Sequence, residues 1–373
     1  MITVLVHYER ISLFHTMLPF LLKNKSKKTF YFTQSVNWCL NKDKNDILFM
    51  ERCFQHRQPK DLQSDELEIL KKLRDKYKTI IYFCGQPEAG TNRLDVLPFA
   101  DILFYKSVFS DFNNYKKNLY GKNLFADFYH KNNGITDNPE YINKDIITEE
   151  DLKKIKLSWN IGVGTYPRWN FPQRLGTISA RANMPVIGQF IGGKPLNRVS
   201  FPGCAKINKN IFTNNRNINV HARIDPVTCP SIAYQRVLFL NIISNLKRDR
   251  QILFLTGTVA QKQYYKELVN SKIVLSPFGW GEVCFRDFEA IISGALLLKP
   301  DMSHLVTWPD IYLPYETYIP LKWDGSDLLE KTEYYLNNEK ERIRITQNAY
   351  NHYSDELSAL ERRFEDLLGE YFS

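Results

Sequence analysis

The stretch from Lys272 to Leu305 contains the residues whose types and spacing best suit the binding of a phosphorylated ligand. It reads KIVLSPFGWGEVCFRDFEAIISGALLLKPDMSHL: an apolar run, a turn with Gly279 and Gly281 around a tryptophan, a helical pattern and a second apolar run. Small residues let a ligand approach the backbone closely, and a helix N-terminus offers free N–H groups that suit a phosphate. We therefore predict a ligand-binding turn at this position.

The helix predicted over Glu282–Ser293 presents a row of charged side chains. At 100° per residue, Glu282, Arg286 and Glu289 fall within about 60° of one another on one face. An arginine can hold a diphosphate bidentately, and a carboxylate can accept hydrogen bonds from two vicinal hydroxyls, as in a ribose. A solvated helix face is the alternative. The glycine turn and the apolar run after the helix favour a binding site, because a surface helix needs neither.

The segment Ser276–Pro300, SPFGWGEVCFRDFEAIISGALLLKP, resembles the donor-site signature of GT-B glycosyltransferases of the exostosin-like and group 1 families. The likeness is to cytoplasmic enzymes of bacteria and large viruses, whose pattern is a serine–proline turn, glycines and R-x-x-E-A. It implies that Arg286 contacts the donor diphosphate, that Glu289 binds the ribose, and that Glu282 lies near the transferred sugar. Six residues separate the two glutamates, where many retaining enzymes have seven, so the stereochemical outcome stays open.

Three further basic residues are candidates for donor binding. Arg223 ends the strand predicted over Ile218–Ala222, and Arg236 lies on the helix that follows. The resemblance implies that basic residues in this region neutralise the leaving diphosphate, although Arg223 is equally well explained as a surface arginine at a strand end. Lys299 follows the ALLL run and could face the same pocket, but Lys–Pro after a strand is also common turn chemistry.

On the acceptor side, an inverting enzyme needs a base that deprotonates the incoming hydroxyl. Side chains at the carboxyl ends of first-half strands meet that condition. His7, in VLVHYER, and Glu88, in YFCGQPEAG, are the candidates, with Glu9 and Asp95 as nearby alternatives. Any of them could instead be a cap or a solvated residue. The stretch Thr165–Asn170, TYPRWN, either borders the cleft with stacking aromatics or forms a packed turn.

Apolar runs that alternate with helical patterns must position these residues. The first half predicts a helix over Leu62–Tyr77 and strands over Thr3–Val6, Phe30–Thr33, Ile47–Met50, Thr79–Cys84, Ile102–Tyr105 and Ser158–Val163. The second predicts strands over Ile218–Ala222, Ile252–Thr256, Ile273–Ser276 and Ala295–Leu298, with helices over Ser231–Leu246, Gln261–Asn270, Glu282–Ser293, Asp327–Asn338 and onward to Tyr371. Such alternation is typical of parallel sheets, so the expected fold is α/β with two Rossmann-like doubly wound domains.

The chain of 373 residues is long enough for two domains. Periodic apolar patterns stop between Gly192 and Asn217, which places the junction there. We expect an N-terminal acceptor-binding domain over 1–200 and a C-terminal nucleotide-sugar-binding domain with terminal helices over 215–373, separated by a cleft.

Charge and composition narrow the possible partners. The formal net charge of +9 indicates an anionic partner. This partner could be a phosphorylated small molecule, an acidic membrane surface to which the protein binds peripherally, or nucleic acid. Nucleic acid is disfavoured because the basic residues form no arm or tail. No apolar run is long enough to span a bilayer and no signal peptide is evident, so we expect a cytoplasmic protein. Neither D-x-D, C-x-x-C nor zinc spacing occurs, so neither metal nor cofactor is expected.

These observations together predict transfer of a monosaccharide from a nucleoside diphosphate sugar to a hydroxyl of a glycan or glycolipid. Two alternatives stay open: a polyol-phosphate transferase or nucleotide-sugar hydrolase on the same fold, and a non-catalytic nucleotide- or glycan-binding module.

Overall fold

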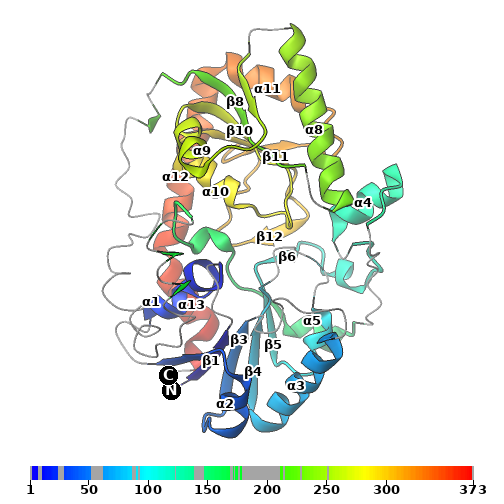
Figure 1. Ribbon diagram of the computed structural model, residues 1–373, viewed down its shortest axis with the longest axis vertical. Helices are drawn as coiled ribbons and strands as arrows, with labels where there is room; N and C mark the ends of the chain where they lie inside the picture. The colour runs from blue at the N-terminus through cyan, green and yellow to red at the C-terminus, as the bar shows by residue number, and fades with distance from the viewer. Residues whose placement is uncertain are drawn as a thin grey trace.

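The computed structural model describes residues 2–6, 11–23, 29–51, 62–85, 90, 93–121, 123–137, 147–168, 171, 173–174, 177–178, 211–212, 215–226, 229–249 and 252–371. Within these ranges the chain builds two parallel sheets, one in each half of the molecule (Figure 1). The predicted α/β class with two Rossmann-like halves is confirmed.

The first sheet has the strand order β2-β1-β3-β4-β5-β7, and every neighbouring pair is parallel. Its strands are β1 (Ile2–Val6), β2 (Phe30–Thr33), β3 (Ile47–Glu51), β4 (Thr79–Phe83), β5 (Ile102–Tyr105) and β7 (Ile155–Leu157). The strands β1 and β5 are buried along their whole length, as expected for a sheet covered on both faces.

The second sheet has the order β13-β11-β10-β8-β9 and is also parallel throughout. Its strands are β8 (Ile218–Ala222), β9 (Phe254–Thr256), β10 (Ser271–Leu275), β11 (Leu296–Pro300) and β13 (Ile319–Leu321). In both sheets the first strand lies between the second and the third. Ligands of such sheets bind where the winding direction changes, which is beside the carboxyl ends of β8 and β10 in this half.

Helices connect and cover the strands (Figure 1). They are α1 (Leu18–Lys23), α2 (Val36–Asn41), α3 (Leu62–Lys76), α4 (Leu124–Asn133), α5 (Glu149–Lys154), α8 (Pro230–Asp249), α9 (Gln261–Leu268), α10 (Phe285–Ile292), α11 (Leu328–Asn337), α12 (Glu339–Ser358) and α13 (Leu360–Leu368). None of the helices within the described ranges combines the length and apolar composition that a bilayer crossing requires.

Two predicted elements differ from the structure. The strand expected over Ser158–Val163 is shifted: β7 ends at Leu157, and Ile161–Val163 forms a 3₁₀ turn. The side chain of Asn160 accepts a hydrogen bond from the backbone N–H of Gly162 at 2.8 Å and so favours the turn. The helix expected from Glu282 begins instead at Phe285, because the Asp287 carboxylate accepts from the backbone N–H of Cys284 at 2.8 Å and caps the first turn.

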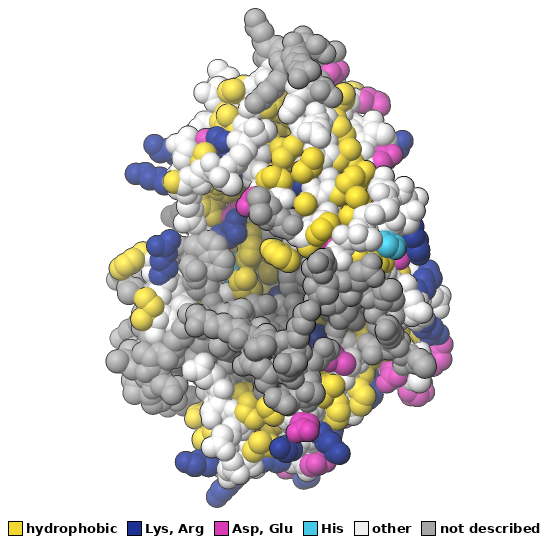
Figure 2. Space-filling model, turned by 45° about the vertical axis from the view of Figure 1, so that its right-hand side comes forward, with side chains coloured by type: hydrophobic (Ala, Val, Ile, Leu, Met, Phe, Trp, Pro, Cys, Tyr) yellow, Lys and Arg dark blue, Asp and Glu magenta, His cyan; other side chains and the backbone are white. Residues whose placement is uncertain are grey.

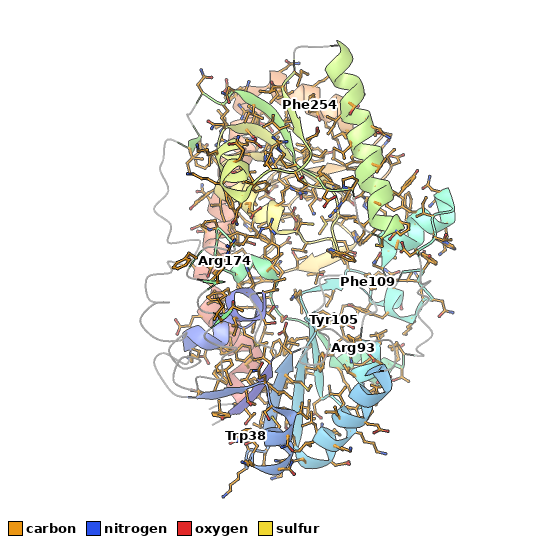
Figure 3. All side chains as sticks on the ribbon, viewed as in Figure 1. Trp38, Arg93, Tyr105, Phe109, Arg174 and Phe254 are labelled. Atoms are coloured by element: carbon orange, nitrogen blue, oxygen red, sulfur yellow. The ribbon has the colours of Figure 1, made fainter. Side chains whose placement is uncertain are left out.

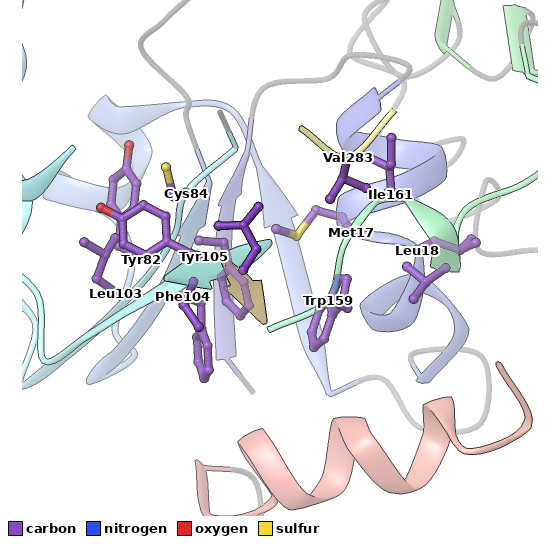
Figure 4. Packing of buried hydrophobic residues seen from close by; sticks show 14 of the residues in the cluster. Met17, Leu18, Tyr82, Cys84, Leu103, Phe104, Tyr105, Trp159, Ile161 and Val283 are labelled. Atoms are coloured by element: carbon purple, nitrogen blue, oxygen red, sulfur yellow. The ribbon is translucent and has the colours of Figure 1, made fainter. Parts of the chain in front are cut away.

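The two halves are joined by more than the chain connection. Strand β6 (Ser107–Phe109) of the first half pairs antiparallel with β12 (Leu305–Thr307) of the second. Val283 of the second half lies beside Ile161 of the first, as Figure 4 shows, and both belong to one large buried cluster. The junction expected between Gly192 and Asn217 lies outside the described residues except for 211–212 and 215–217.

The C-terminal helices return to the first half. Helix α12 runs down the side of the molecule, and α13 lies beside α1 near both chain ends (Figure 1). The ring of Phe364 on α13 packs edge-on against Phe20 and Phe30, with centroids 5.0 and 6.1 Å away. The last of the terminal helices that the sequence grouped with 215–373 thus packs on the first half, whereas α11 packs on α8 and β10 of the second.

Candidate active site

A glycine turn follows β10 at the switch point of the second sheet. The backbone N–H of Gly279 donates to the carbonyl of Gly281 at 2.9 Å and closes the turn. A Cβ at position 279 would lie 3.2 Å from Cys284 Sγ and 3.3 Å from Arg236 Nη2. Glycine therefore lets the arginine and the thiol pack closely on the backbone.

Behind the turn, a buried carboxylate anchors the start of α10. Asp287 is fully buried and accepts hydrogen bonds from Ser276 Oγ at 2.5 Å and Tyr312 Oη at 2.7 Å. The Lys299 ammonium pairs with the same carboxylate at 3.0 Å, and both side chains are wholly buried. Lys299, which the sequence placed in the donor pocket, is thus engaged in this network and does not line the cavity described next.

A cavity of about 290 Å³ lies between the two halves, beside the glycine turn. The first half contributes lining residues Ile11, Gly85, Lys106, Ser107, Asn160, Ile161 and Arg168; the second contributes Arg236, Gly279, Trp280, Gly281, Val283, Cys284, Phe285 and Arg286. Four of these side chains are cationic, and no Asp or Glu is among the lining residues that the structure describes. The cavity therefore suits an anion.

Arg286 and Arg236 reach this cavity from the second half. The Arg286 guanidinium donates from Nη2 to the backbone carbonyl of Arg223 at 2.7 Å, and its buried Nε has no hydrogen-bond partner among the described residues. Arg236 donates to the carbonyls of Phe278 and Asp225 at 3.1 and 2.6 Å. Burial lowers the pKa of Arg236. Within the described part of the chain, neither guanidinium pairs with a carboxylate, so both charges are available to a ligand.

The predicted donor residue Arg223 is placed differently. Its guanidinium binds the Glu267 carboxylate bidentately, with both N–O distances 2.8 Å, and this pair ties the end of β8 to α9. The side chain does not line the cavity. Its backbone carbonyl, however, is the acceptor that orients Arg286, so Arg223 supports the site through its main chain.

Glu289 lies on α10, one turn after Arg286, and its side chain is only 1% exposed. One carboxylate oxygen accepts from Arg168 Nε at 2.8 Å and Tyr265 Oη at 2.7 Å, and the other accepts from Tyr264 Oη at 2.8 Å. Arg168 belongs to the first half. The contact therefore links the two halves directly behind the cavity wall.

Glu282 lies in the turn that precedes α10, so the prediction that it shares a helix face with Arg286 and Glu289 is wrong. It is completely buried, and its Oε1 lies 3.8 Å from Nε2 of His304. Its neighbours Gly281 and Val283 line the cavity, whereas Glu282 itself does not.

The acceptor-side candidates are less fully described. His7, Glu88 and the alternative Glu9 lie outside the described residues. Asp95 accepts a hydrogen bond from Arg93 Nε at 3.0 Å and does not line the cavity. Sequence reasoning missed Lys106, whose only signal is its position directly after the apolar run of β5.

Arg168 belongs to the TYPRWN stretch that the sequence placed either at the cleft or in a packed turn. Its guanidinium lines the cavity and lies over the Phe285 ring, 4.9 Å from the ring centre. The local sequence pattern did not indicate that Arg168, rather than the aromatic residues beside it, would line the cavity.

Comparison with known proteins agrees with this geometry. Residues 214–369, which include the glycine turn, Arg236 and α10, match the family described as "Glycosyl transferase-like". None of the curated proteins compared with the chain matches it in sequence.

Several solved structures resemble the whole chain at low identity. Alr3699/HepE of Anabaena in complex with UDP has 10% identity and a TM-score of 0.46, with 99% of each chain covered. An alpha-glucosyltransferase in complex with UDP-glucose and DNA containing an abasic site has the same identity, coverage and score. A glycosyltransferase from Rickettsia africae shows 10% identity, a TM-score of 0.46, and coverage of 99% of this chain and 97% of its own.

Proposed function

We propose that the chain is a glycosyltransferase that moves a monosaccharide from a nucleoside diphosphate sugar to a hydroxyl of a glycan or glycolipid. One observation carries the proposal: Arg236 and Arg286 converge on a cavity beside the glycine turn, with guanidinium groups bonded only to backbone carbonyls in the described part of the chain. The match of residues 214–369 to a glycosyltransferase-like family supports it.

The leaving group of this reaction is a nucleoside diphosphate, which gains negative charge as the bond to the sugar breaks. Two fixed guanidinium groups stabilise that charge without rearrangement, and a partly buried site strengthens each contact. The N-terminus of α10 adds backbone N–H groups and the positive end of its dipole at the same wall. We propose that these groups supply the positive charge that stabilises the departing nucleoside diphosphate, and that no metal cofactor is needed.

The remaining roles follow the sequence resemblance. We assign Glu289 to the nucleotide ribose and Glu282 to the neighbourhood of the transferred sugar. The first half would bind the acceptor, because it forms the opposite wall of the cavity. The candidate bases stay His7 and Glu88, which lie outside the described residues.

The decisive variant is Arg286→Ala. We expect it to fold normally and to lose transfer. Its affinity for a nucleoside diphosphate should fall about 10- to 150-fold, the size of a lost hydrogen bond between charged groups, while affinity for the bare nucleoside changes little. Calorimetric titration with UDP, GDP, CDP, ADP and their nucleosides would measure both affinities. Arg174→Ala is the matched control, since Arg174 is exposed and does not line the cavity.

These titrations, together with an assay of donor turnover with and without acceptors, separate the alternatives. Diphosphate binding that is unchanged in Arg286→Ala would contradict the donor-site assignment. Hydrolysis of the donor with no response to any acceptor would favour a nucleotide-sugar hydrolase. Tight binding without turnover of any donor would favour a binding module.

A further inference from the structure

The Glu289 carboxylate already accepts hydrogen bonds from three protein side chains. It accepts three hydrogen bonds, from Arg168, Tyr264 and Tyr265, at 2.7 to 2.8 Å. A carboxylate offers about four lone-pair positions, so one remains. The two vicinal hydroxyls of a ribose would need two. A ribose can therefore bind Glu289 in the proposed manner only if one of the present donors leaves.

Arg168 is the donor best able to leave. Its side chain is 30% exposed, whereas Glu289 is only 1% exposed, so water and ligand can reach the guanidinium. Arg168 comes from the first half. Both tyrosines lie on α9, which packs on the same sheet as α10, the helix that carries Glu289. Its guanidinium also lies over the Phe285 ring at the cavity wall. A small rotation about this contact would keep the arginine in the cavity while it releases the carboxylate.

We propose that Arg168 occupies the ribose position on Glu289 when no donor is bound, and that the ribose hydroxyls of the donor replace it. The displaced guanidinium then faces the diphosphate and adds a third arginine to Arg236 and Arg286. This exchange rests on the proposed function, because it requires Glu289 to be the ribose ligand. It makes Arg168 a positioning residue that couples donor binding to the contact between the two halves.

The exchange has a measurable signature, since an internal competitor lowers the apparent affinity of the ligand that must displace it. Removing Arg168 should therefore strengthen binding of the ribose hydroxyls specifically. A residue that merely ties the halves together would instead change protein stability and leave hydroxyl recognition as it was.

The test compares uridine, cytidine, guanosine and adenosine with their 2′,3′-dideoxy forms by calorimetric titration. For the parent protein, the ratio of the dideoxynucleoside Kd to the ribonucleoside Kd measures hydroxyl recognition. In Arg168→Ala we expect this ratio to rise about tenfold, the size of one hydrogen bond to a charged group. The preference for diphosphate over nucleoside should fall at the same time, because the displaced guanidinium no longer meets the phosphates.

Two further variants secure the test. Arg168→Gln keeps the side-chain length without the charge and should change the ratio in the same direction; it replaces the alanine variant if that protein does not fold. Arg174→Ala removes an exposed arginine six positions later, at the edge of the molecule in Figure 3, and should leave the ratio unchanged.

A ratio that stays constant or falls in the Arg168 variants, while the parent still binds nucleoside diphosphate, overturns the exchange alone. Failure of the parent to bind any nucleoside diphosphate overturns the proposed function and the exchange with it.

Discussion

Arg286 and Glu289 lie one turn apart on α10, yet they differ in how many protein groups their charged ends contact. The arginine is bonded only to a backbone carbonyl and keeps a buried Nε without a partner among the described residues. The glutamate is surrounded by three donors. An unsatisfied buried donor costs free energy unless a ligand satisfies it. A single helix thus offers one charge that is open to a ligand and one that a protein group already holds.

Lys299 shows how a charged residue in a donor-site motif can be structural. Lys299→Met removes the partner of the buried Asp287 and should reduce the free energy of unfolding by about 3–5 kcal/mol. Urea denaturation measures this loss. In the protein that remains folded, the fall in nucleoside diphosphate affinity should be smaller than for Arg286→Ala. A stable variant that loses diphosphate binding would return Lys299 to the donor site.

Two buried histidines predict how stability depends on pH. Burial lowers the pKa of His15 and of His221 to about 3, so both are neutral in the folded protein at neutral pH. In the unfolded chain the same histidines take up protons near pH 6.5. The folded protein therefore keeps its full free energy of unfolding above that pH and loses stability as the pH falls from 6.5 towards 3. Each histidine should contribute a slope of about 1.4 kcal/mol per pH unit.

The contribution of His221 to this pH dependence can be measured separately. His221 has no hydrogen bond from either ring nitrogen to any described residue, so His221→Met should preserve packing and remove one of the two contributions. Urea denaturation at several values between pH 4 and 6.5 should show a slope about 1.4 kcal/mol per pH unit smaller than in the parent. An unchanged slope would mean that His221 does not titrate as described.

At the scale of elements, the turn between β10 and α10 determines where Arg236 can lie. A methyl group at position 279 would press on Arg236 Nη2 and Cys284 Sγ. Gly279→Ala should therefore displace the guanidinium by a few tenths of an ångström and reduce the transfer rate by roughly tenfold, because positioning errors of this kind are costly in catalysis. Steady-state rates with saturating donor would show the effect.

The same contact supplies a control for this prediction. Cys284→Ala removes the sulfur that crowds the added methyl group, so the double variant should recover part of the lost rate. If Gly279→Ala transferred sugar as fast as the parent, close packing at the turn would not position Arg236.

At the scale of the whole molecule, the C-terminal helix α13 stabilises the half that is most distant from it in sequence. Phe364→Ala would open a cavity among Phe20, Phe30 and Trp159 and should cost about 3–5 kcal/mol of unfolding free energy. Tyr334→Ala on α11 is the control, since Tyr334 is 52% exposed and its removal should cost less than about 0.5 kcal/mol. Equal losses in the two variants would contradict this role of α13.

The distribution of charge on the surface also belongs to this scale. On the face shown in Figure 2, Lys and Arg side chains are scattered over both halves and interspersed with Asp and Glu. Four cationic side chains, two from each half, line the cavity between the halves.

The amino-acid sequence by itself determined strands β1 to β5 and β8 to β11, the glycine turn and the presence of Arg286 beside it, because these features depend on local periodicity and residue types. It did not predict β6, β12 or β13, and it placed β7 too late in the chain. Strand β10, the turn and the following helix were all found where the local pattern predicted them, apart from the helix start at Phe285 rather than Glu282. That start depended on the Asp287 side chain, which competes for the first backbone N–H groups.

The tertiary structure alone decided which charges pair. Glu289 binds Arg168, which is 121 positions away, and Arg223 binds Glu267, so the predicted ribose ligand is occupied and one predicted phosphate ligand is engaged elsewhere. Such pairs form only when packing brings distant side chains together, and local spacing carries no information about them. The return of α13 to the first sheet has the same cause, since an amphipathic helix specifies that it needs an apolar surface but not which one.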